Sequence, residues 1–237
     1  MAIDQGLLDL AGRGTACLRL YRWHPSCLSF GRNEPAGRRY DRGRIEALGL
    51  DTVRRPTGGR AVWHADELTY AVACPGDRFG ALATAYRTIH ETIARALAEL
   101  GVTVSLAGSG RAVVGLDAGA CFGSPAGGEV MAYGRKVVGS AQLRHGDAML
   151  QHGSVLLAGS QRIVERVTRG PAAPSLDAPL GQFLERRVTF DEIAEAIGDS
   201  ARAWSGGWDT LDDPGEELGA AAPHLERFSS ADWTWRR

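Results

Sequence analysis

The cysteine at position 121 and the lysine fifteen positions after it are the two residues of this chain best suited to covalent chemistry. Cys121 stands in a glycine-rich stretch, residues 107–128, which contains seven glycines and no regular apolar period. Such a stretch predicts a long loop, and a loop can present a thiol, which is nucleophilic as the thiolate. Lys136 is predicted to lie on a strand that returns under this loop, where its ammonium group would stabilise the thiolate.

Each member of this pair also has an ordinary interpretation. An isolated cysteine is most often a small buried hydrophobic residue. A lysine on a strand is commonly exposed to solvent, and sequence spacing does not exclude this for Lys136. The pairing of Cys121 with Lys136 is therefore a hypothesis about their positions in space.

The segment RRPTGGRAVWH, residues 54–64, combines paired glycines with three arginines. Exposed backbone N–H groups beside a guanidinium group can bind an anion or a carbonyl oxygen. The alternative is a Pro-Thr-Gly-Gly turn between two strands with solvated arginines. A nucleotide-binding P-loop is excluded because the segment has no GxxxxGK[ST] pattern.

A polar trio interrupts an apolar, strand-like run at LQHGS, residues 150–154. His152 could bind a carbonyl oxygen or move a proton, although a lone histidine is more often structural. His90, inside a predicted helix, is interpreted as a surface or packing residue. The six histidines show no HxH or HxxxH spacing and the four cysteines form no CxxC pair, so we expect no metal site.

The elements that would position these residues are mostly strands. Alternating patterns predict short strands in CLRLYRW, CLSFGR, DTVRRP and RAVWHADELTYAVACP. A series of antiparallel strands is predicted from residue 129 to residue 158, with turns at Tyr133-Gly134 and at residues 145–147. Strands that follow one another in this way favour an antiparallel sheet over a parallel, doubly wound one.

Helical patterns occur at both ends of the chain and once in its middle. Apolar residues recur at steps of three and four through residues 81–100, which predicts an amphipathic helix. Helices are also predicted for MAIDQGLLDLA, residues 1–11, for TFDEIAEAIGDSARAW with Thr189 as N-cap, and for PGEELGAAAPHLERFSS. We therefore expect an α+β fold with a largely antiparallel mixed sheet flanked by helices, in a single domain over residues 1–237. Its core would cover about residues 15–160 and a helical C-terminal extension about residues 183–237.

Composition limits the classes of partner. Lys and Arg total 27 against 28 Asp and Glu, so the net charge of −1 indicates neither nucleic-acid nor membrane binding. The chain lacks the run of roughly 20 apolar residues that a membrane helix needs, and its N-terminus does not resemble a secretion signal. We expect a cytoplasmic protein whose cysteines are free thiols.

Four ordered motifs resemble the biotin/lipoate A/B protein ligase superfamily. They are LRLYRWHPSCLSFGR, VRRPTGGRAVWHADELTYAV, the cysteine-to-lysine region ending in GRKVVGSAQLR, and LQHGSVLL. Within that superfamily the chain is most similar to the cysteine-dependent octanoyltransferases, over nearly its whole length. The resemblance implies the catalytic-domain fold of biotin and lipoate protein ligases and an acyltransferase that needs no cofactor.

The implied reaction begins protein lipoylation. An octanoyl group would pass from the thioester of acyl carrier protein through an acyl-cysteine to a lysine of a lipoyl domain. The acceptor would be the glycine cleavage H protein or the E2 subunit of a 2-oxoacid dehydrogenase. The resemblance makes Cys121 the nucleophile and Lys136 the residue that lowers its pKa, and either Lys136 or His152 could accept the proton of the acceptor lysine. The implied acyl pocket consists of Arg55, Gly58, Gly59, Arg60, Ala61, His64, Gly139, Ser140, Ala141, His152, Gly153 and Ser154.

Three alternatives share the same resemblance. An ATP-dependent lipoate or octanoate ligase is disfavoured because ADELTYAV follows His64, where such ligases typically have an Asp-x-Gly-Asn pattern. An amidotransferase would move octanoyl between lipoyl domains, and a non-catalytic subunit would only bind them. Relatives often have a strand before the first helix, so either the chain starts late or its sheet lacks an edge strand.

Overall fold

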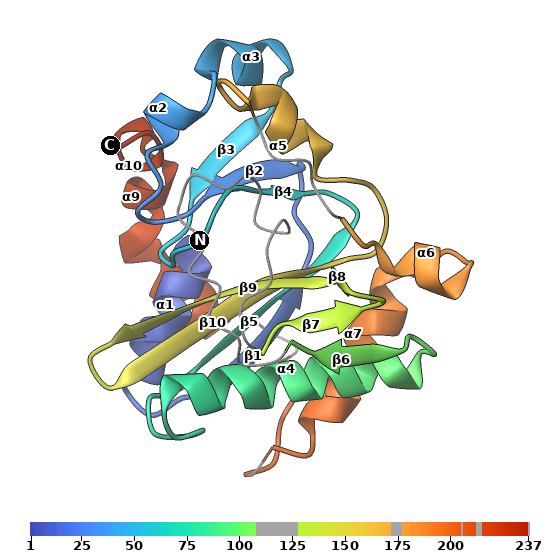
Figure 1. Ribbon diagram of the computed structural model, residues 1–237. Helices are drawn as coiled ribbons and strands as arrows, with labels where there is room; N and C mark the ends of the chain where they lie inside the picture. Colours follow the sequence, from blue (N-terminus) through green and yellow to red (C-terminus); the bar gives the residue numbers. More distant parts are fainter. Residues whose placement is uncertain (108–127, 172–176, 205, 212–214, 237) are drawn as a thin grey trace.

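The computed structural model describes residues 1–107, 128–171, 177–204, 206–211 and 215–236. Its largest sheet has four antiparallel strands in the order β1-β5-β10-β9 (Figure 1). Their bounds are β1 Cys17–Tyr21, β5 Glu67–Pro75, β9 Val138–His145 and β10 Ala148–Leu156. Gly153 of β10 lies opposite Tyr70 of β5 on one side and opposite Ser140 of β9 on the other. The polar trio of LQHGS is thus part of a continuous strand and does not interrupt it.

Helices cover both faces of this sheet. Helix α1 (Ala2–Ala11) packs Leu7 and Leu8 against the small residues Ala71, Ala73 and Ala148 on one face. On the other face lie α4 (Leu82–Glu99) and α7 (Phe190–Ala201), which pack against each other below the sheet (Figure 1). The side chains of each strand alternate between the α1 face and the α4 face.

The helix predicted over residues 81–100 is α4, and its apolar period explains its position. Ile89, Ile93 and Leu97 are buried at steps of four and enter the main core. Each such side chain contributes about 1.5–3 kcal/mol when it leaves water. His90 lies on the same buried stripe with no exposed surface, so of its two interpretations the surface one is wrong and the packing one agrees with the structure.

A second sheet of three strands lies above the first, in the order β3-β2-β4. Its strands are β2 Cys27–Phe30, β3 Asp51–Arg54 and β4 Val62–His64. β2 and β3 are parallel, and the connection between them contains α2 (Ala36–Arg39) and α3 (Arg42–Ala47). Helix α5 (Arg162–Val167) packs Val164 and Val167 into the small core of this sheet with Phe30 and Tyr40.

A third sheet, β6-β7-β8, extends the lower layer beside α4. Its strands are β6 Val104–Leu106, β7 Val130–Ala132 and β8 Arg135–Lys136. The predicted turn at Tyr133-Gly134 joins β7 to β8, with φ angles of 48° and 75°. Two successive positive φ angles match the right-handed twist of a tight hairpin.

The chain ends in helices, as the sequence predicts. After α6 (Leu180–Leu184), helix α7 begins at the expected capping box, in which Thr189 and Glu192 each bond the other's backbone. The segment predicted as one last helix is divided into α8 (Gly215–Ala221), a 3₁₀ turn at Ala222–His224 and α9 (Leu225–Ser229), because Pro223 cannot donate a helical hydrogen bond. Helix α10 (Ala231–Thr234) follows.

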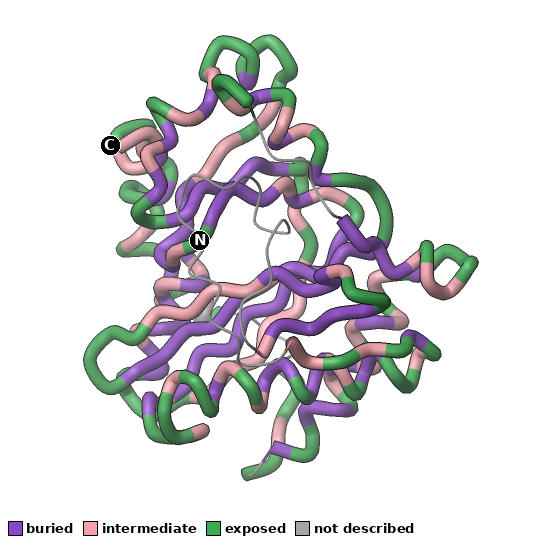
Figure 2. Tube along the Cα trace, viewed as in Figure 1, coloured by how far each residue is buried: buried purple, intermediate pink, exposed green. Residues whose placement is uncertain are grey.

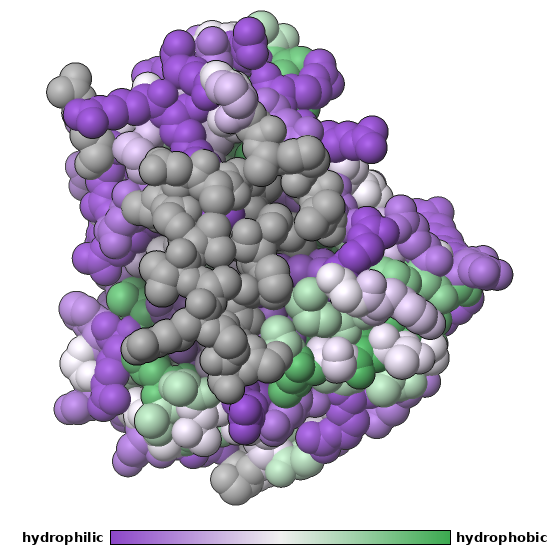
Figure 3. Space-filling model, viewed as in Figure 1, coloured by the Kyte–Doolittle hydropathy of each residue, from purple (hydrophilic) through white to green (hydrophobic). Residues whose placement is uncertain are grey.

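The lower and upper sheets differ in their burial and in the polarity of the surface around them. The central strands β5 and β10 of the lower sheet are buried along nearly their whole length (Figure 2). The surface over the upper sheet and its helices is mainly hydrophilic in Figure 3.

No helix in the part of the chain that the structure describes is long and apolar enough to cross a bilayer. The architecture is the α+β class, with mostly antiparallel pairing and one parallel pair.

Candidate active site

An open pocket lies between the upper sheet and the α1 face of the lower sheet. Nine of the twelve residues implied as an acyl pocket line it: Arg55, Gly59, His64, Gly139, Ser140, Ala141, His152, Gly153 and Ser154. Gly58, Arg60 and Ala61 are not among its lining residues. Five further residues line it that the motifs do not single out, namely Met1, Tyr21, Trp23, Val62 and Thr69. The pocket therefore combines a mainly apolar wall with a few polar groups, as small-molecule sites do.

The Pro-Thr-Gly-Gly loop between β3 and β4 is braced from inside by a buried arginine. The Arg55 guanidinium donates to the carbonyl oxygens of Gly58 and Arg60, at 3.2 and 2.7 Å, and to both Ser29 oxygens. Arg54 is also fully buried. The interpretation of these arginines as solvated is therefore wrong, and Arg55 uses its donors on the protein backbone.

His64 is held by hydrogen-bonding neighbours at both ring nitrogens. The Ser29 hydroxyl accepts from Arg55 at 2.5 Å and lies 2.6 Å from His64 Nε2. The Nδ1–H of His64 donates to Glu67 Oε1 at 2.6 Å. Trp23 stacks on the imidazole with ring centroids 4.5 Å apart. His64 thus forms a rigid wall of the pocket.

His152 is held in the same manner by residues from two distant segments. Asp4 Oδ2 lies 3.0 Å from His152 Nδ1, and Thr57 Oγ1 lies 2.5 Å from Nε2. Burial raises the pKa of Asp4, but the hydrogen bond from His152 and the charge of Arg19 outweigh it and keep the pKa below its usual range. Burial lowers the pKa of His152. The arrangement is an ionised carboxylate, a neutral imidazole and a hydroxyl that donates to it.

Both pocket histidines therefore have a carboxylate on Nδ1 and a hydroxyl on Nε2. The two hydroxyls, on Ser29 and Thr57, are themselves buried, so neither is placed to attack a substrate. Each histidine instead ties a strand of one sheet to a segment from elsewhere in the chain. Their ring nitrogens are occupied by the protein, which makes both residues braces of the pocket.

A third buried histidine supports the pocket from the α4 face. His90 Nδ1 lies 2.6 Å from the carbonyl oxygen of Gly128, so Nδ1 carries the hydrogen and Nε2 accepts from Ser140 Oγ at 2.8 Å. Tyr70 donates to the same Ser140 oxygen at 2.6 Å and accepts from Gln151. Burial lowers the pKa of His90 to about 4, helped by the nearby charge of Lys136. The sequence signal that could have identified this role is that His90 is a polar residue at a position where the apolar period of α4 predicts burial.

Gly153 is required where these two faces meet. A Cβ atom at this position would lie 2.4 Å from Ser140 Oγ, 2.5 Å from the carbonyl oxygen of Gly139 and 2.7 Å from the Tyr70 ring. Real side chains do not tolerate such contacts. The absence of a side chain at Gly153 allows Tyr70 and Ser140 to meet across β10.

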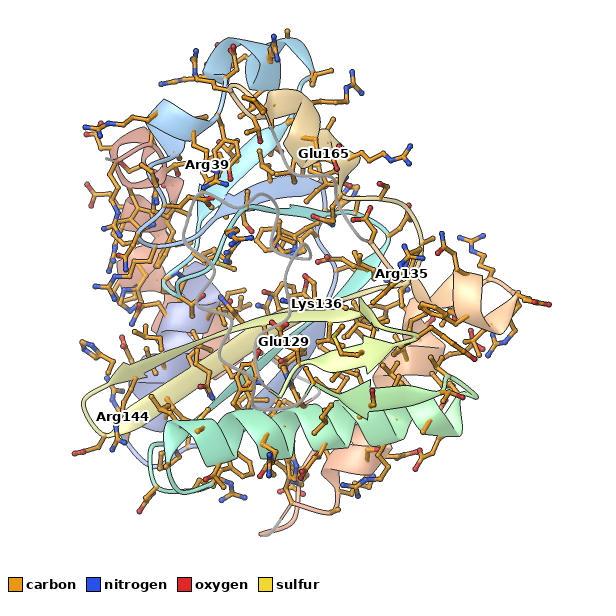
Figure 4. All side chains as sticks on the ribbon, in the orientation of Figure 1. Arg39, Glu129, Arg135, Lys136, Arg144 and Glu165 are labelled. Carbon is orange, nitrogen blue, oxygen red and sulfur yellow. The ribbon has the colours of Figure 1, made fainter. Side chains whose placement is uncertain are left out.

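Lys136 is buried, contrary to the expectation for an ordinary strand lysine. Its ammonium group forms an ion pair with Glu129, and both side chains are 4% exposed (Figure 4). Glu129 precedes β7 and Lys136 ends β8, so the β7–β8 hairpin brings the two groups together. Cys121 lies outside the described residues, and its proximity to Lys136 stays a prediction.

Comparison with known proteins shows the family of this chain. The model of the lipoyl protein ligase A/B catalytic domain matches residues 1–202. The chain belongs to this family. A relative from Exiguobacterium sp. (strain AT1b), named octanoyltransferase LipM, is 34% identical in an alignment that covers all of this chain and 93% of the relative. Octanoyltransferase LipM of Carboxydothermus hydrogenoformans is 40% identical over 86% of this chain and 75% of its own length.

Solved structures of lipoate-protein ligases have the same fold. A lipoate-protein ligase A bound with ATP aligns with a TM-score of 0.79 at 21% identity, covering 99% of this chain and 92% of that one. A bipartite lipoate protein ligase from Thermoplasma acidophilum aligns with a TM-score of 0.77 at 21% identity, covering 99% and 89%. These likenesses show that the chain has the fold of the lipoyl protein ligase family.

Metal chemistry has no candidate centre in the described ranges, where no three His, Cys, Asp or Glu side chains are grouped as ligands. Cys27 and Cys74 are buried thiols, and burial raises the pKa of Cys74 to about 11. Cys17, on β1, is half-buried. In this member of the lipoyl protein ligase family, the predicted pocket residues converge through β9, β10 and the Pro-Thr-Gly-Gly loop.

Proposed function

We propose that this chain is an octanoyltransferase of protein lipoylation. The observation that carries the proposal is the convergence of nine implied acyl-pocket residues on one pocket, in a chain matched along its length by proteins named octanoyltransferases. The donor is a carrier-protein thioester and the acceptor is a lysine of a lipoyl domain. Acyl carrier protein is the proposed donor, and the glycine cleavage H protein or an E2 lipoyl domain is the proposed acceptor.

The lining of the pocket suits the octanoyl chain. Each buried methylene group contributes about 0.8 kcal/mol, so the tail supplies about 5 kcal/mol before ordering costs. Val62, Trp23 and the strand backbone at Gly139 and Gly153 supply the apolar and side-chain-free surface that such a tail needs.

The proposed chemistry consists of two acyl transfers at one sulfur atom. The Cys121 thiolate attacks the thioester carbonyl carbon, a new C–S bond forms, the C–S bond to the carrier breaks, and the carrier's sulfur leaves as a thiol with the proton that Lys136 gives up. The acceptor lysine, as a free amine, then attacks the acyl-cysteine; the C–N bond forms and the C–S bond to Cys121 breaks. The proton of the amine must pass to a base. Exchange between thioesters is nearly balanced and amide formation is downhill, so ATP is not required.

Lys136 is the better of the two proposed bases. His152 uses Nδ1 on Asp4 and Nε2 on Thr57, so a substrate amine would have to displace a buried hydrogen bond to reach it. Lys136 instead lies at the end of the segment that contains Cys121, buried with Glu129. In the proposed cycle Lys136 holds the proton while Cys121 is a thiolate, and takes up the acceptor's proton when the amide forms.

Glu67 occupies the position at which this chain departs from the ATP-dependent ligases. It lies three residues after His64 and accepts from both His64 and Thr69, at 2.6 and 2.5 Å. The carboxylate thus braces the pocket wall from behind. The departure of this sequence from the ligase pattern after His64 supports the transferase over the ligase.

The test is octanoyl transfer to a lipoyl domain without ATP. Wild-type protein, Cys121→Ala and Cys17→Ala are mixed with octanoyl-acyl carrier protein and a lipoyl domain, and acceptor mass is followed. We expect transfer by wild type and Cys17→Ala, and a loss of more than about a thousandfold in Cys121→Ala, because the covalent route is removed. Transfer that requires ATP and survives Cys121→Ala would identify a ligase instead. Preferential use of an octanoylated H protein as donor would identify an amidotransferase, and binding of the lipoyl domain with no turnover of any donor would identify a non-catalytic subunit.

A further inference from the structure

Three arginines gather around one tryptophan near the C-terminal end of the chain. The guanidinium groups of Arg227 and Arg236 lie 3.7 and 3.8 Å from the ring centroid of Trp233. Two such groups this close to one ring must occupy its opposite faces. Arg236 also donates to the carbonyl oxygen of Arg32 at 2.5 Å, which joins a third cation to the group. We call Arg32, Arg227 and Arg236 the arginine cluster.

The charges of the arginine cluster are not balanced by acidic neighbours. In the described part of the chain, no carboxylate lies within 4.0 Å of any of the three guanidinium groups. Partial burial and then the positive charge of Arg32 lower the pKa of both Arg227 and Arg236, so the three groups repel one another. Arg32 and Arg227 are exposed. A concentrated positive charge therefore faces solvent on a chain whose net charge is −1.

Buried hydrogen bonds hold the cluster in place. Arg54 donates to the carbonyl oxygens of Trp233, Thr234 and Arg236 at 2.9–3.0 Å, and also to that of Gly31 at 2.6 Å. Trp233 Nε1 returns a bond to the Arg54 carbonyl oxygen at 3.1 Å. The backbone that carries Trp233 and Arg236 is thus held beside Gly31 before any partner arrives, which reduces the ordering cost of binding.

The cluster adjoins the pocket through the Pro-Thr-Gly-Gly loop. The backbone N–H of Arg32 donates to the Thr57 carbonyl oxygen at 2.7 Å. The preceding residue, Gly31, is so close to the loop that a Cβ atom there would lie 1.8 Å from the carbonyl oxygen of Gly59. Gly59 lines the pocket. A partner that reaches into the pocket therefore approaches beside the arginine cluster.

We propose that the arginine cluster is the docking surface for an acidic face of the carrier protein that presents the octanoyl thioester. The inference rests on the proposed function. Charge favours the carrier-protein donor over the lipoyl-domain acceptor as the partner, because the acceptor brings a lysine ammonium that the cluster repels. The indole of Trp233 separates two of the cations, so a spread of carboxylates fits the cluster better than one phosphate group does.

The test compares donors that carry the same acyl group on different supports. The variant Arg32→Glu/Arg227→Glu reverses two charges whose side chains make no hydrogen bond that holds the fold. The matched control, Arg13→Glu/Arg187→Glu, makes the same change in net charge at exposed positions outside the cluster. For each protein, kcat/KM is measured with octanoyl-acyl carrier protein, with octanoyl-coenzyme A and with a short octanoyl thioester that has no phosphate, at low and high salt.

We expect the cluster variant to lower kcat/KM for the carrier-protein donor about tenfold or more relative to the short thioester, and to flatten the salt dependence. The control should keep the wild-type ratio. An equal loss with octanoyl-coenzyme A would show a phosphate site, and a rise only in the KM of the lipoyl domain would show an acceptor site; either result overturns the proposal. Loss of transfer from every donor by the wild-type protein would reject the proposed function instead. Arg227→Gln repeats the comparison if the double variant has a lowered melting temperature.

Discussion

Protein groups lie within hydrogen-bond distance of both ring nitrogens of each buried histidine around the pocket. The Gly128 carbonyl can only accept, so Nδ1 of His90 carries the hydrogen. The ionised Asp4 makes the same choice for His152. With their nitrogens occupied by the protein, the histidines act as supports of the pocket. This assigns the acid–base chemistry elsewhere, to Lys136 in our proposal.

His90 makes the stability of the protein depend on pH in a defined direction. Its pKa is about 4 in the folded protein and about 6.5 in the unfolded chain, so below pH 6.5 the unfolded chain binds a proton that the folded one does not. The free energy of unfolding should therefore decrease as pH falls from 6.5 toward 4. For His90 alone the decrease between pH 6.5 and 5 is about 2 kcal/mol.

Urea unfolding at pH 7 and pH 5 measures this effect in wild type, His90→Asn and, as a control, His145→Asn on the exposed β9–β10 turn. Asparagine can still donate to Gly128 but does not titrate. We expect His90→Asn to be less stable at pH 7 and to lose less stability on acidification. Parallel pH dependences in wild type and His90→Asn would contradict the assignment.

At the scale of elements, β10 pairs with β5 on one side and with β9 on the other, and Gly153 is a position on β10 with no space for a side chain. Gly153→Ala places a methyl group within 2.7 Å of Ser140, Gly139 and Tyr70, so we expect a loss of about 1–3 kcal/mol in the free energy of unfolding. Gly198→Ala is the matched control, because Gly198 lies in α7 with open space around it and alanine should stabilise the helix by up to about 1 kcal/mol. Denaturant unfolding of both variants separates the two effects, and equal stability changes would contradict the packing described.

Local patterns predict the elements but not their partners. The steps of three and four in residues 81–100, the Thr189 capping box and the Tyr133-Gly134 turn each depend on neighbours within a few residues, and the structure confirms all three. Alternation along a strand does not say which strand lies beside it, so the division into three sheets and the parallel β2–β3 pair were not predicted. The contact between Asp4 and His152 joins positions 148 residues apart and has no local signal.

At the scale of the whole molecule, segments from both ends of the chain support the structure around the pocket. Helix α1 supplies Asp4 to His152, and α8 packs on α1. The C-terminal residues 233–236 are bound by Arg54 beside the segment that begins at Gly31. The candidate pocket residues could be named from motifs because they lie in two short segments, whereas these long-range supports depend on packing of the complete fold.

The central claim is that an acyl group passes through Cys121 on its way to the lipoyl domain. The most direct measurement incubates the protein with octanoyl-acyl carrier protein, removes the donor, and then adds a lipoyl domain without ATP while the masses of both proteins are recorded. We predict an octanoyl adduct that peptide mapping places on Cys121, and its transfer to the acceptor lysine in the chase. An adduct on another residue, or an adduct that persists while the acceptor is modified by free donor, would contradict the account.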